Sequence, residues 1–575
     1  MYKEYVSKKT NIKYNLMDYK NELFLHYNIE DGIFIPMAVK EDGKMFNLIL
    51  DDKIKPYALF VGSTGTGKTN ALHNVIINVN CHYTKEDIEI WLLDLKTTEF
   101  SNYSQYLLPN IKILGMDDSP EFIVSFFKKL IEKMEERKTL FKNIRVANIS
   151  DYNSYSNVKM PRLLLIIDEF HKFVQALTDA NMNEEFENML SESRVLGLRC
   201  IFSDQDINGS GMNAFTEKAR NQIRTRISWL NPIDKVIQSL ELSTANIDRV
   251  TLKNRLDQFS SGEIIINDNN SISFAKVLYV ETKNNLDLEY VSSRLPDNND
   301  IIIIDKPRRE KMNKNYILEL EKKICDLNKE NIYVYLGTNN TFEKYMYFSF
   351  GKRSRENLLI SSDSEDYKMS LIISLITCLT RDNKNKVTLI ATKKSDLFIR
   401  NKILFNSMKS LNIISIYQES NEICNYLATM NKMMNEIGNI NEFIILLDID
   451  NLFDIFDSTN ILNNGGNIFD SISSESVQSK SVQLVNMLNF GSKNRMHFIV
   501  LTNCIKDMSY IRQIKIDMFN HKIFGKENKL SLLSSEIENS VRNKISSLSD
   551  DNLIYCDVFN YFSIFKPFKE EILER

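Results

Sequence analysis

The chain has 575 residues, which is enough for about three or four domains or for fewer large ones. Hydrophobic residues make up 43% and charged residues 26%, so the composition is that of an ordinary globular protein. The formal net charge of −4 excludes a global basic field, so any contact with nucleic acid would need a local basic lining.

The cysteines and the apolar runs indicate the compartment. The 7 cysteines are odd in number and include no CxxC pair, which argues for a reducing compartment and against a disulfide framework or a zinc site. The N-terminus is polar and lacks a signal peptide, and no run reaches the roughly 18 apolar residues of a membrane span. We therefore expect a cytoplasmic protein without a transmembrane segment.

Residues 1–48 are expected to form an N-terminal leader built around a β-hairpin. Two apolar stretches, residues 32–39 and 45–50, lie on either side of the turn sequence Glu41-Asp42-Gly43-Lys44. Short strands around a glycine-containing turn are typical of a hairpin. We expect this hairpin to lead into the next strand of the chain.

A glycine-rich stretch after the apolar run at residues 57–61 is the strongest motif in the chain. It reads Gly62-Ser63-Thr64-Gly65-Thr66-Gly67-Lys68-Thr69 and runs into a predicted helix. Strand, glycine-rich turn and helix in this order form the P-loop pattern, so we expect the chain to bind a nucleoside triphosphate, most simply ATP. The candidate nucleotide-binding residues are Gly62, Ser63, Thr64, Gly65, Thr66, Gly67, Lys68, Thr69 and Asn70.

Each residue type in this stretch has a physical reason to be there. Glycines let the backbone fold tightly enough for successive N–H groups to point at phosphate oxygens, and the helix N-terminus adds partial positive charge. Lys68 is placed to reach the β- and γ-phosphates, and the Thr69 hydroxyl is placed to ligate Mg²⁺.

Two acids follow a later hydrophobic strand. Residues 88–96 and 162–168 are predicted strands, with a helical pattern at residues 121–141 between them. The second strand ends in Asp168 and Glu169, a Walker B arrangement in which Asp168 holds Mg²⁺ through water and Glu169 polarises the attacking water. A solvated strand end is the alternative for such a pair. Strands separated by helices predict a parallel α/β sheet, which binds nucleotides at the carboxyl ends of its strands.

Residues 198–205 form another predicted strand that ends in a polar group. Gln205 is a candidate sensor of the γ-phosphate, although a glutamine in a loop is usually just solvated. Arg224 and Arg226 stand at the start of a further strand, and residues 262–266 close the region with one more.

Taken in order, several blocks within residues 30–270 resemble the FtsK/SpoIIIE motor family, which is close to HerA and to the type VII secretion ATPases. The blocks are the P-loop, Leu93-Asp94-Leu95-Lys96-Thr97-Thr98-Glu99-Phe100-Ser101, Ile167-Asp168-Glu169-Phe170, Ser193-Arg194-Val195-Leu196-Gly197-Leu198, Asp204-Gln205 and Thr225-Arg226-Ile227. The resemblance implies a RecA-like motor domain that works as a ring, usually a hexamer, and translocates a polymer.

The chain departs from the family's pattern at several positions. Thr97-Thr98 replaces two glycines and Ser193 replaces another. Arg199 stands where the family has a histidine, and Asp204 replaces the threonine that precedes Gln205.

A P-loop motor needs a second cation at the transition state, which a neighbouring subunit supplies as an arginine finger worth roughly 10³–10⁵ in rate. Arg226, Arg224 and Arg194 are the candidates, in that order. For each one singly, pairing with a local carboxylate is an equally good interpretation. We therefore expect self-association, with a hexameric ring as the form that the resemblance implies.

Residues 286–330 are predicted to be a linker, because they contain the polar stretch 294–300 and the charge run 306–311. The charge run fits a solvated linker better than a grip on DNA.

The second half of the chain repeats the first in outline. Strands predicted at residues 357–360, 386–391, 443–448 and 497–503 parallel those at residues 57–61, 88–96, 162–168 and 198–205. Residues 361–368, which stand where the glycines should be, contain no glycine and include three carboxylates that would repel phosphate. Ile449 is interpreted as occupying the place of Glu169. An unrelated α/β domain is the alternative.

The predicted fold is therefore α/β, with two tandem RecA-like P-loop domains of mainly parallel sheets. The first, residues 49–285, is expected to be competent for ATP hydrolysis, and the second, residues 331–575, to be degenerate. ATP and Mg²⁺ are the expected cofactors.

Three functions remain open. The first expectation is an ATP-driven motor that translocates or remodels DNA. The second is a cytoplasmic ATPase of a type VII-like secretion system that moves a partner protein, which the tandem of an active and a degenerate domain favours. The third is a non-translocating assembly or regulatory ATPase whose second domain docks a partner.

Overall fold

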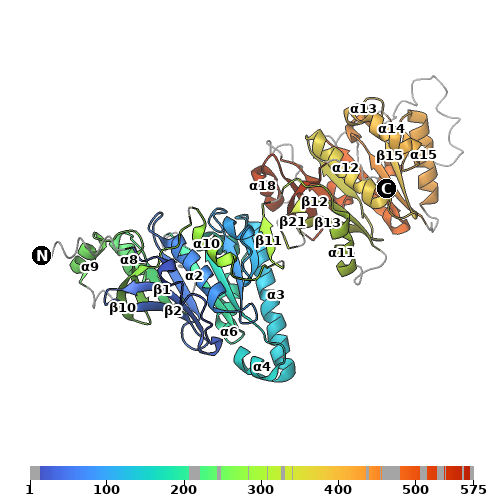
Figure 1. The fold of residues 1–575 in the computed structure, drawn as a ribbon. Coiled ribbons are helices and arrows are strands. Elements are labelled where there is room, and N and C mark those ends of the chain that lie inside the picture. The colour runs from blue at the N-terminus through green and yellow to red at the C-terminus, as the bar shows by residue number, and fades with distance from the viewer. Residues whose placement is uncertain are drawn as a thin grey trace, which may run out of the picture. The chain divides into compact units, whose positions relative to one another are not determined.

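The structure is a computed structural model of the whole chain (Figure 1). It describes residues 13–205, 220–242, 248–282, 284–298, 300–306, 308–324, 331–339, 341–342, 344–434, 440–452, 455, 480–505, 514–526, 537, 539–559 and 562–569. The chain divides into two compact units, residues 1–306 and residues 307–575. The division falls inside the segment predicted as a linker.

The first unit is built on an 11-stranded sheet in the order β11-β5-β4-β6-β7-β3-β8-β9-β10-β1-β2. Its strands are β1 (Ile33–Lys40), β2 (Met45–Leu50), β3 (Tyr57–Val61), β4 (Ile88–Asp94), β5 (Ile111–Met116), β6 (Arg162–Asp168), β7 (Leu198–Asp204), β8 (Ile223–Ser228), β9 (Glu263–Asp268), β10 (Ser271–Val277) and β11 (Ile302–Asp305). The pairs from β11 to β8 are parallel, and those from β8 to β2 are antiparallel.

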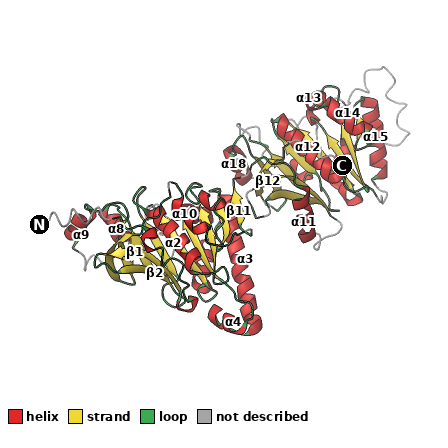
Figure 2. Ribbon diagram, in the orientation of Figure 1, coloured by secondary structure: helices red, strands yellow, loops and turns green. Residues whose placement is uncertain are grey.

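Helices cover this sheet (Figure 2). They are α2 (Lys68–His82), α3 (Pro120–Ile144), α4 (Ile149–Tyr155), α5 (Phe170–Asp179), α6 (Asn183–Ser193), α8 (Ile233–Ser239), α9 (Arg249–Leu256) and α10 (Leu286–Ser292). Helix α3 begins with Pro120 at its first turn and buries Phe122, Phe126 and Leu130 on one face, which is the spacing of an amphipathic helix.

An aromatic cluster fixes the start of α5, the helix that follows the two predicted acids. Phe170 packs on Phe202 of β7 with ring centroids 4.4 Å apart, and Phe173 packs against Phe186 of α6 at 5.3 Å. Phe127 of α3 meets both Phe173 and Phe186 edge-on. Because these rings are buried, they hold the first turn of α5 in place against the sheet.

The predicted hairpin is present, as β1 and β2 pair antiparallel with an irregularity between Pro36 and Ala38. Strand β1 also pairs with β10, so that the hairpin is part of the same sheet as the P-loop strand and not a separate leader. The pairing partner lies far along the chain, which local sequence patterning does not reveal.

Residues predicted as a linker also carry regular structure. They include α10, β11 and α11 (Lys314–Ile324), and the apolar residues of β11 pair in parallel with β5 at the edge of the first sheet. Lys306 of the charge run pairs with Asp118 at 3.1 Å.

The second unit is built on a 10-stranded sheet in the order β13-β12-β21-β20-β19-β14-β18-β17-β15-β16. Its strands are β12 (Ile332–Asn339), β13 (Tyr345–Phe350), β14 (Leu358–Ser361), β15 (Asn385–Ile390), β16 (Ser415–Tyr417), β17 (Asn441–Leu446), β18 (Met496–Thr502), β19 (His521–Phe524), β20 (Leu553–Asp557) and β21 (Phe562–Pro567). Its remaining helices are α12 (Glu365–Leu379), α13 (Asp396–Arg400), α14 (Lys402–Ser410), α15 (Ser420–Met433), α17 (Lys480–Phe490) and α18 (Asn539–Ser547).

The two sheets have the same topology. Read from β2 to β5 in the first unit and from β13 to β16 in the second, every strand has a counterpart at the same place in the order. The central strands are β3 and β14, and each lies between two parallel neighbours. The predicted fold class of two tandem α/β units with mainly parallel sheets is therefore confirmed.

Gly337 provides a test of how β12 packs against β21 in the second unit. An added Cβ at Gly337 would overlap the carbonyl oxygen of Lys566 on β21, whereas at Gly351 the nearest atom would be 3.4 Å away. We expect Gly337→Ala to destabilise the second unit by about 2 kcal/mol and to lower its melting temperature, and Gly351→Ala to leave it unchanged. Thermal unfolding followed by circular dichroism makes the comparison, and equal melting temperatures for both variants would contradict the register of β12 on β21.

Candidate functional site

The loop between β3 and α2 has the backbone that a phosphate cradle requires. Gly65 and Gly67 adopt left-handed φ angles of 80° and 108°, which residues with a Cβ rarely tolerate. Gly62 lies against a buried tryptophan, and an added Cβ there would come within 2.6 Å of the Cβ of Trp229. The three glycines of the loop are thus required, Gly65 and Gly67 by their backbone conformation and Gly62 by the lack of space for a Cβ.

A cavity of about 870 Å³ opens at this loop. Of the predicted nucleotide-binding residues, all except Gly62 and Thr66 line it, and Asp168, Glu169 and Gln205 line it too. The structure therefore brings the two predicted motifs to one cavity at the carboxyl ends of the parallel strands, where such sheets bind nucleotides.

Lys68 and Asp168 lie side by side at the base of the cavity. The Nζ atom of Lys68, a residue only 6% exposed, is 3.4 Å from Oδ1 of Asp168. The same carboxylate oxygen accepts a hydrogen bond of 2.6 Å from the hydroxyl of Ser203 on the neighbouring strand. A buried lysine, a fixed carboxylate and the Thr69 hydroxyl at the cavity wall are donors and oxygen ligands of the kind that fit a nucleotide with Mg²⁺.

Glu169 is held in an unusual backbone conformation between β6 and α5. Its φ is 57° in the left-handed region, which for a glutamate costs on the order of 1–3 kcal/mol and is found most often at functional sites. Its Oε1 accepts a hydrogen bond of 2.5 Å from Nε2 of Gln205, and Oε1 of Gln205 accepts one of 2.9 Å from the Thr64 hydroxyl. Gln205 thus connects the P-loop to Glu169.

Asn70 takes part in the fold as well as in the cavity wall. Its side-chain amide donates to the carbonyl of Val280 at 2.6 Å and accepts from the N–H of Val280 at 3.0 Å. The amide is therefore bound to the segment after β10, and the role of Asn70 toward a nucleotide stays a prediction.

Asp94 organises the loop after β4. Its buried carboxylate accepts N–H groups of Lys96, Thr97 and Phe100 at 2.9–3.0 Å, and burial raises its pKa. This loop brings Lys96 to the cavity, where it pairs with Glu99 at 2.6 Å. This block belongs to the resemblance, but the sequence alone indicates no role for its residues.

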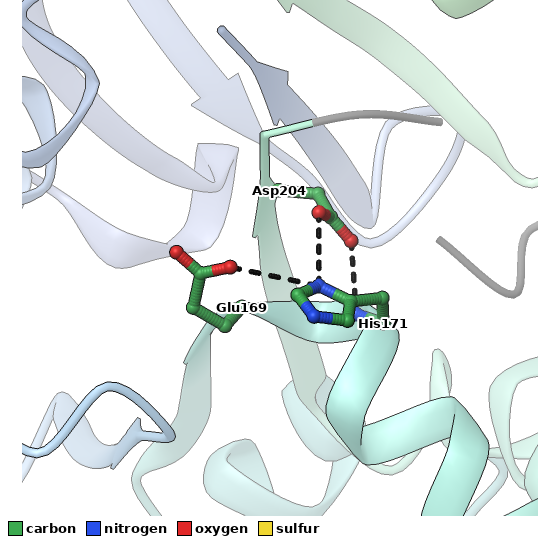
Figure 3. Close-up of side chains that lie close together, drawn as sticks. All are labelled: Glu169, His171 and Asp204. Carbon is green, nitrogen blue, oxygen red and sulfur yellow. Dashed lines mark hydrogen bonds and ion pairs between the residues drawn. The ribbon is translucent and has the colours of Figure 1, made fainter. Parts of the chain in front are cut away.

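The sequence also gives no sign of a second arrangement, which Glu169, His171 and Asp204 form. His171 on the first turn of α5 lies against Asp204 at the end of β7 and beside Glu169, so that one ligand atom from each lies within 4.8 Å of the others (Figure 3). Within the described part of the chain, these three residues are the group whose atoms lie closely enough to share a cation. The histidine follows the acid pair by only two positions, and its proximity to Asp204 depends on the pairing of β6 with β7.

The three candidate arginine fingers differ in exposure. Arg226 is 4% exposed and pairs with Glu241 at 2.8 Å, while its guanidinium also donates to the carbonyls of Arg220, Ile223 and Ser239. Burial lowers its pKa. A side chain bound in this way within its own unit is not presented to a neighbour, which weighs against the first-ranked candidate.

Arg194 and Arg224 are both exposed. Arg194 donates to the carbonyl of Lys53 at 2.9 Å. Their exposure leaves them as the better candidates for action on a neighbouring subunit, which stays a prediction.

The sheet register aligns the second unit with the first. Val61 at the end of β3 pairs with the last residue of β7, and Ser361 at the end of β14 pairs with the last residue of β18. Counting seven residues onward from each, Lys368 is the counterpart of Lys68. The second unit therefore keeps the lysine but not the glycines before it.

The predicted alignment of the acids in the second unit with those in the first differs from the observed one. Continuing the pairing of β17 with β18 beyond Leu446–Val500 places Leu447 at the position of Asp168 and Asp448 at that of Glu169. Glu169 and Asp448 also share the left-handed backbone, with φ of 57° and 46°. The interpretation that Ile449 occupies the place of Glu169 is therefore wrong by one residue, because an apolar Leu447 lengthens the hydrophobic run of the strand.

Lys368 is enclosed by its own unit. Its Nζ atom donates to the side-chain oxygen of Asn503 and lies 4.0 Å from Oδ1 of Asp448, whose other oxygen accepts the Ser395 hydroxyl. Burial lowers the pKa of this lysine. A cavity of about 300 Å³ lies beside Ser362–Ser364, much smaller than the cavity of the first unit.

The comparisons with known proteins agree with this geometry. Residues 32–242 match the model of the FtsK/SpoIIIE family. The first unit carries an FtsK/SpoIIIE family domain. The type VII secretion system protein EssC of Staphylococcus aureus (strain MRSA252) is 25% identical over 244 residues, which are 41% of this chain and 15% of that protein. The DNA translocase FtsK of Streptococcus pyogenes serotype M3 (strain SSI-1) is 24% identical over 190 residues, which are 31% of this chain and 23% of that protein. This chain thus matches less than a quarter of the length of either protein.

Solved structures match both units together. The cytoplasmic domain of the type VII secretion ATPase EccC of Thermomonospora curvata has a TM-score of 0.66 at 12% identity, covering 96% of this chain and 65% of its own. EssC (ATPases 2 and 3) of Geobacillus thermodenitrificans has a TM-score of 0.55 at 14% identity, covering 95% and 99%. The two units therefore have the fold of the tandem ATPase domains in these structures. Among the described residues, no helix is long and apolar enough to cross a membrane.

The two counterpart lysines provide a matched pair of variants. We expect Lys68→Met to abolish ATP binding to the full chain, because it removes the cation at the base of the large cavity, and Lys368→Met to leave the stoichiometry of one nucleotide per chain unchanged. Equilibrium binding of a fluorescent ATP analogue measures both. Loss of binding in Lys368→Met with an unchanged melting temperature would contradict the assignment of the nucleotide to the first unit.

Proposed function

We propose that the chain is an ATP-driven translocation motor in which the first unit binds and hydrolyses ATP and the second unit is a copy that does not. The observation that carries the proposal is the convergence of the glycine loop, Lys68, Asp168 and Glu169 on one cavity of about 870 Å³. The second unit keeps a lysine and one acid, but its loop before the helix is shorter and its cavity has a volume of only about 300 Å³.

The residues of the first unit divide the chemistry between them. N–H groups of the loop around Gly65 and Gly67 bind phosphate oxygens, and Lys68 neutralises the β- and γ-phosphates. Thr69 and Asp168 would hold Mg²⁺, and the ion would neutralise charge that develops on the transferred phosphoryl group. Glu169 orients and polarises the attacking water, and Gln205 stands between this acid and the P-loop.

A protein is the first candidate for the polymer that the motor moves. Structures of tandem secretion ATPases match 94–96% of this chain, and one of them, EccC (ATPases 2 and 3) of Thermomonospora curvata, is in complex with a signal sequence peptide at a TM-score of 0.59. DNA is the second candidate, supported by the match of the first unit to FtsK. A cytoplasmic type VII-like secretion motor therefore fits the tandem organisation better than a simple DNA pump.

Replacing the catalytic acid tests the proposed hydrolysis. We expect Glu169→Gln to bind ATP as tightly as the wild type and to hydrolyse it at least about 100-fold more slowly, because the amide no longer polarises the attacking water. Steady-state ATPase assays and nucleotide-binding titrations of the same preparations measure the two effects. Equal turnover in the variant and the wild type would remove Glu169 from the mechanism.

A salt series distinguishes the two polymers. For a protein motor, we expect duplex DNA to change the ATPase rate of the full chain less than about twofold at any salt concentration. For a DNA motor, stimulation would appear at low salt, and the affinity would fall by about 10³–10⁵ between about 50 and 200 mM salt as counterions are released. Such salt-sensitive stimulation would overturn the choice of protein.

Mixing two inactive variants tests catalysis between subunits. Lys68→Met keeps the arginines and Arg224→Ala keeps the P-loop, so a mixed ring contains complete sites if Arg224 acts on a neighbour. We expect the mixture to recover ATPase activity above either variant alone, with Arg294→Ala, an exposed arginine after α10, as a fully active control. No recovery with either Arg224→Ala or Arg194→Ala, together with specific activity that is constant on dilution, would contradict trans catalysis.

A further inference from the structure

Two residues near Glu169, Asp204 and His171, are not part of the Walker B pattern itself, and the structure places them in contact with each other. Asp204 stands where the family pattern has threonine before Gln205, and His171 stands two residues after Glu169. Nδ1 of His171 lies 3.1 Å from Oδ1 of Asp204, and its main-chain N–H donates to Oδ2 at 2.8 Å (Figure 3). The departure at Asp204 thus has a specific partner on α5.

Asp204 fixes two segments at once. It is 1% exposed, and besides the ring and the N–H of His171 it accepts the N–H of Gln205 at 2.7 Å. The carboxylate therefore joins the end of β7 to the first turn of α5. Removing it would release both residues whose side chains approach Glu169.

Those two side chains hold the Glu169 carboxylate from opposite oxygens. Nε2 of Gln205 is 2.5 Å from Oε1, and Nδ1 of His171 is 3.5 Å from Oε2. The contact of Gln205 is a hydrogen bond, whereas the 3.5 Å contact of His171 is longer, and a small movement would shorten it. Catalytic contacts often tighten in this way when substrate binds.

We propose that His171 and Asp204 are positioning residues that hold Glu169 in the orientation required to polarise the attacking water. The proposal rests on the function proposed above for Glu169. Asp204 acts through His171 and through the backbone of Gln205, and His171 acts directly on Oε2 of Glu169.

The electrostatics agree with this arrangement. The hydrogen bond to Asp204 is the largest of the influences that raise the pKa of His171, and Glu169 raises it further, while burial and Lys172 act in the opposite direction. Both carboxylates therefore favour the protonated form of the imidazole. A resident metal ion fits less well, because main-chain N–H groups already occupy both oxygens of Asp204.

The test compares His171→Ala with His26→Ala, a control in which the histidine also lies near an aspartate, Asp87 at 3.7 Å, but does not line the cavity. We expect His171→Ala in the full chain to lower kcat about tenfold and to leave KM for ATP, nucleotide stoichiometry and melting temperature unchanged. His26→Ala should match the wild type. His171→Gln, which can still donate a hydrogen bond, should recover part of the lost kcat.

The outcomes separate this proposal from the one on which it rests. If the wild type hydrolyses no ATP, the proposed function fails. If the wild type is active and His171→Ala has the same kcat, only the positioning role fails. A fall in kcat accompanied by an equal fall in nucleotide stoichiometry or by a lower melting temperature, with no recovery in His171→Gln, would show a merely structural role and overturn the proposal.

Discussion

The residue at which the helix after the central strand begins determines what each unit can hold. In the first unit α2 begins at Lys68, after a loop whose left-handed Gly65 and Gly67 line the cavity. In the second unit α12 begins at Glu365, three residues before the counterpart lysine, and the Ser364 hydroxyl caps its first turn. The residues that would surround the phosphates are thus part of the helix in the second unit. The acids at this end of the helix would also repel an anion.

The pairing of parallel strands supplies the rest of the site. Because β6, β7 and β3 run side by side in register, their last residues meet at one edge, where Asp168 lies opposite Ser203 and Asp204 opposite Val61. The aromatic contacts of α5 with β7 then place Glu169 at the same edge. Long-range pairing and buried packing, and not the motif alone, bring the phosphate loop and the acids to one cavity.

The sequence was sufficient where the signal is local. The P-loop with its glycines, the strand ending in Asp168 and the repeated order of strands were predicted because short patterns specify them. That Arg226 would pair with a nearby carboxylate was one of the two interpretations, but the identity of that carboxylate, Glu241, and the contact of His171 with Asp204 could not be predicted, since each joins elements that are separate in the sequence. The register of Asp448 was missed for a related reason: the end of an apolar run does not fix which residue of the strand lies opposite its neighbour.

The most direct test is a structure of the full chain carrying Glu169→Gln, determined with ATP and Mg²⁺ present. We expect one nucleotide per chain, with its phosphates on residues 62–69 and its metal beside Thr69 and Asp168, and none at residues 361–368. A nucleotide bound to the second unit, or a first unit without one, would contradict the account.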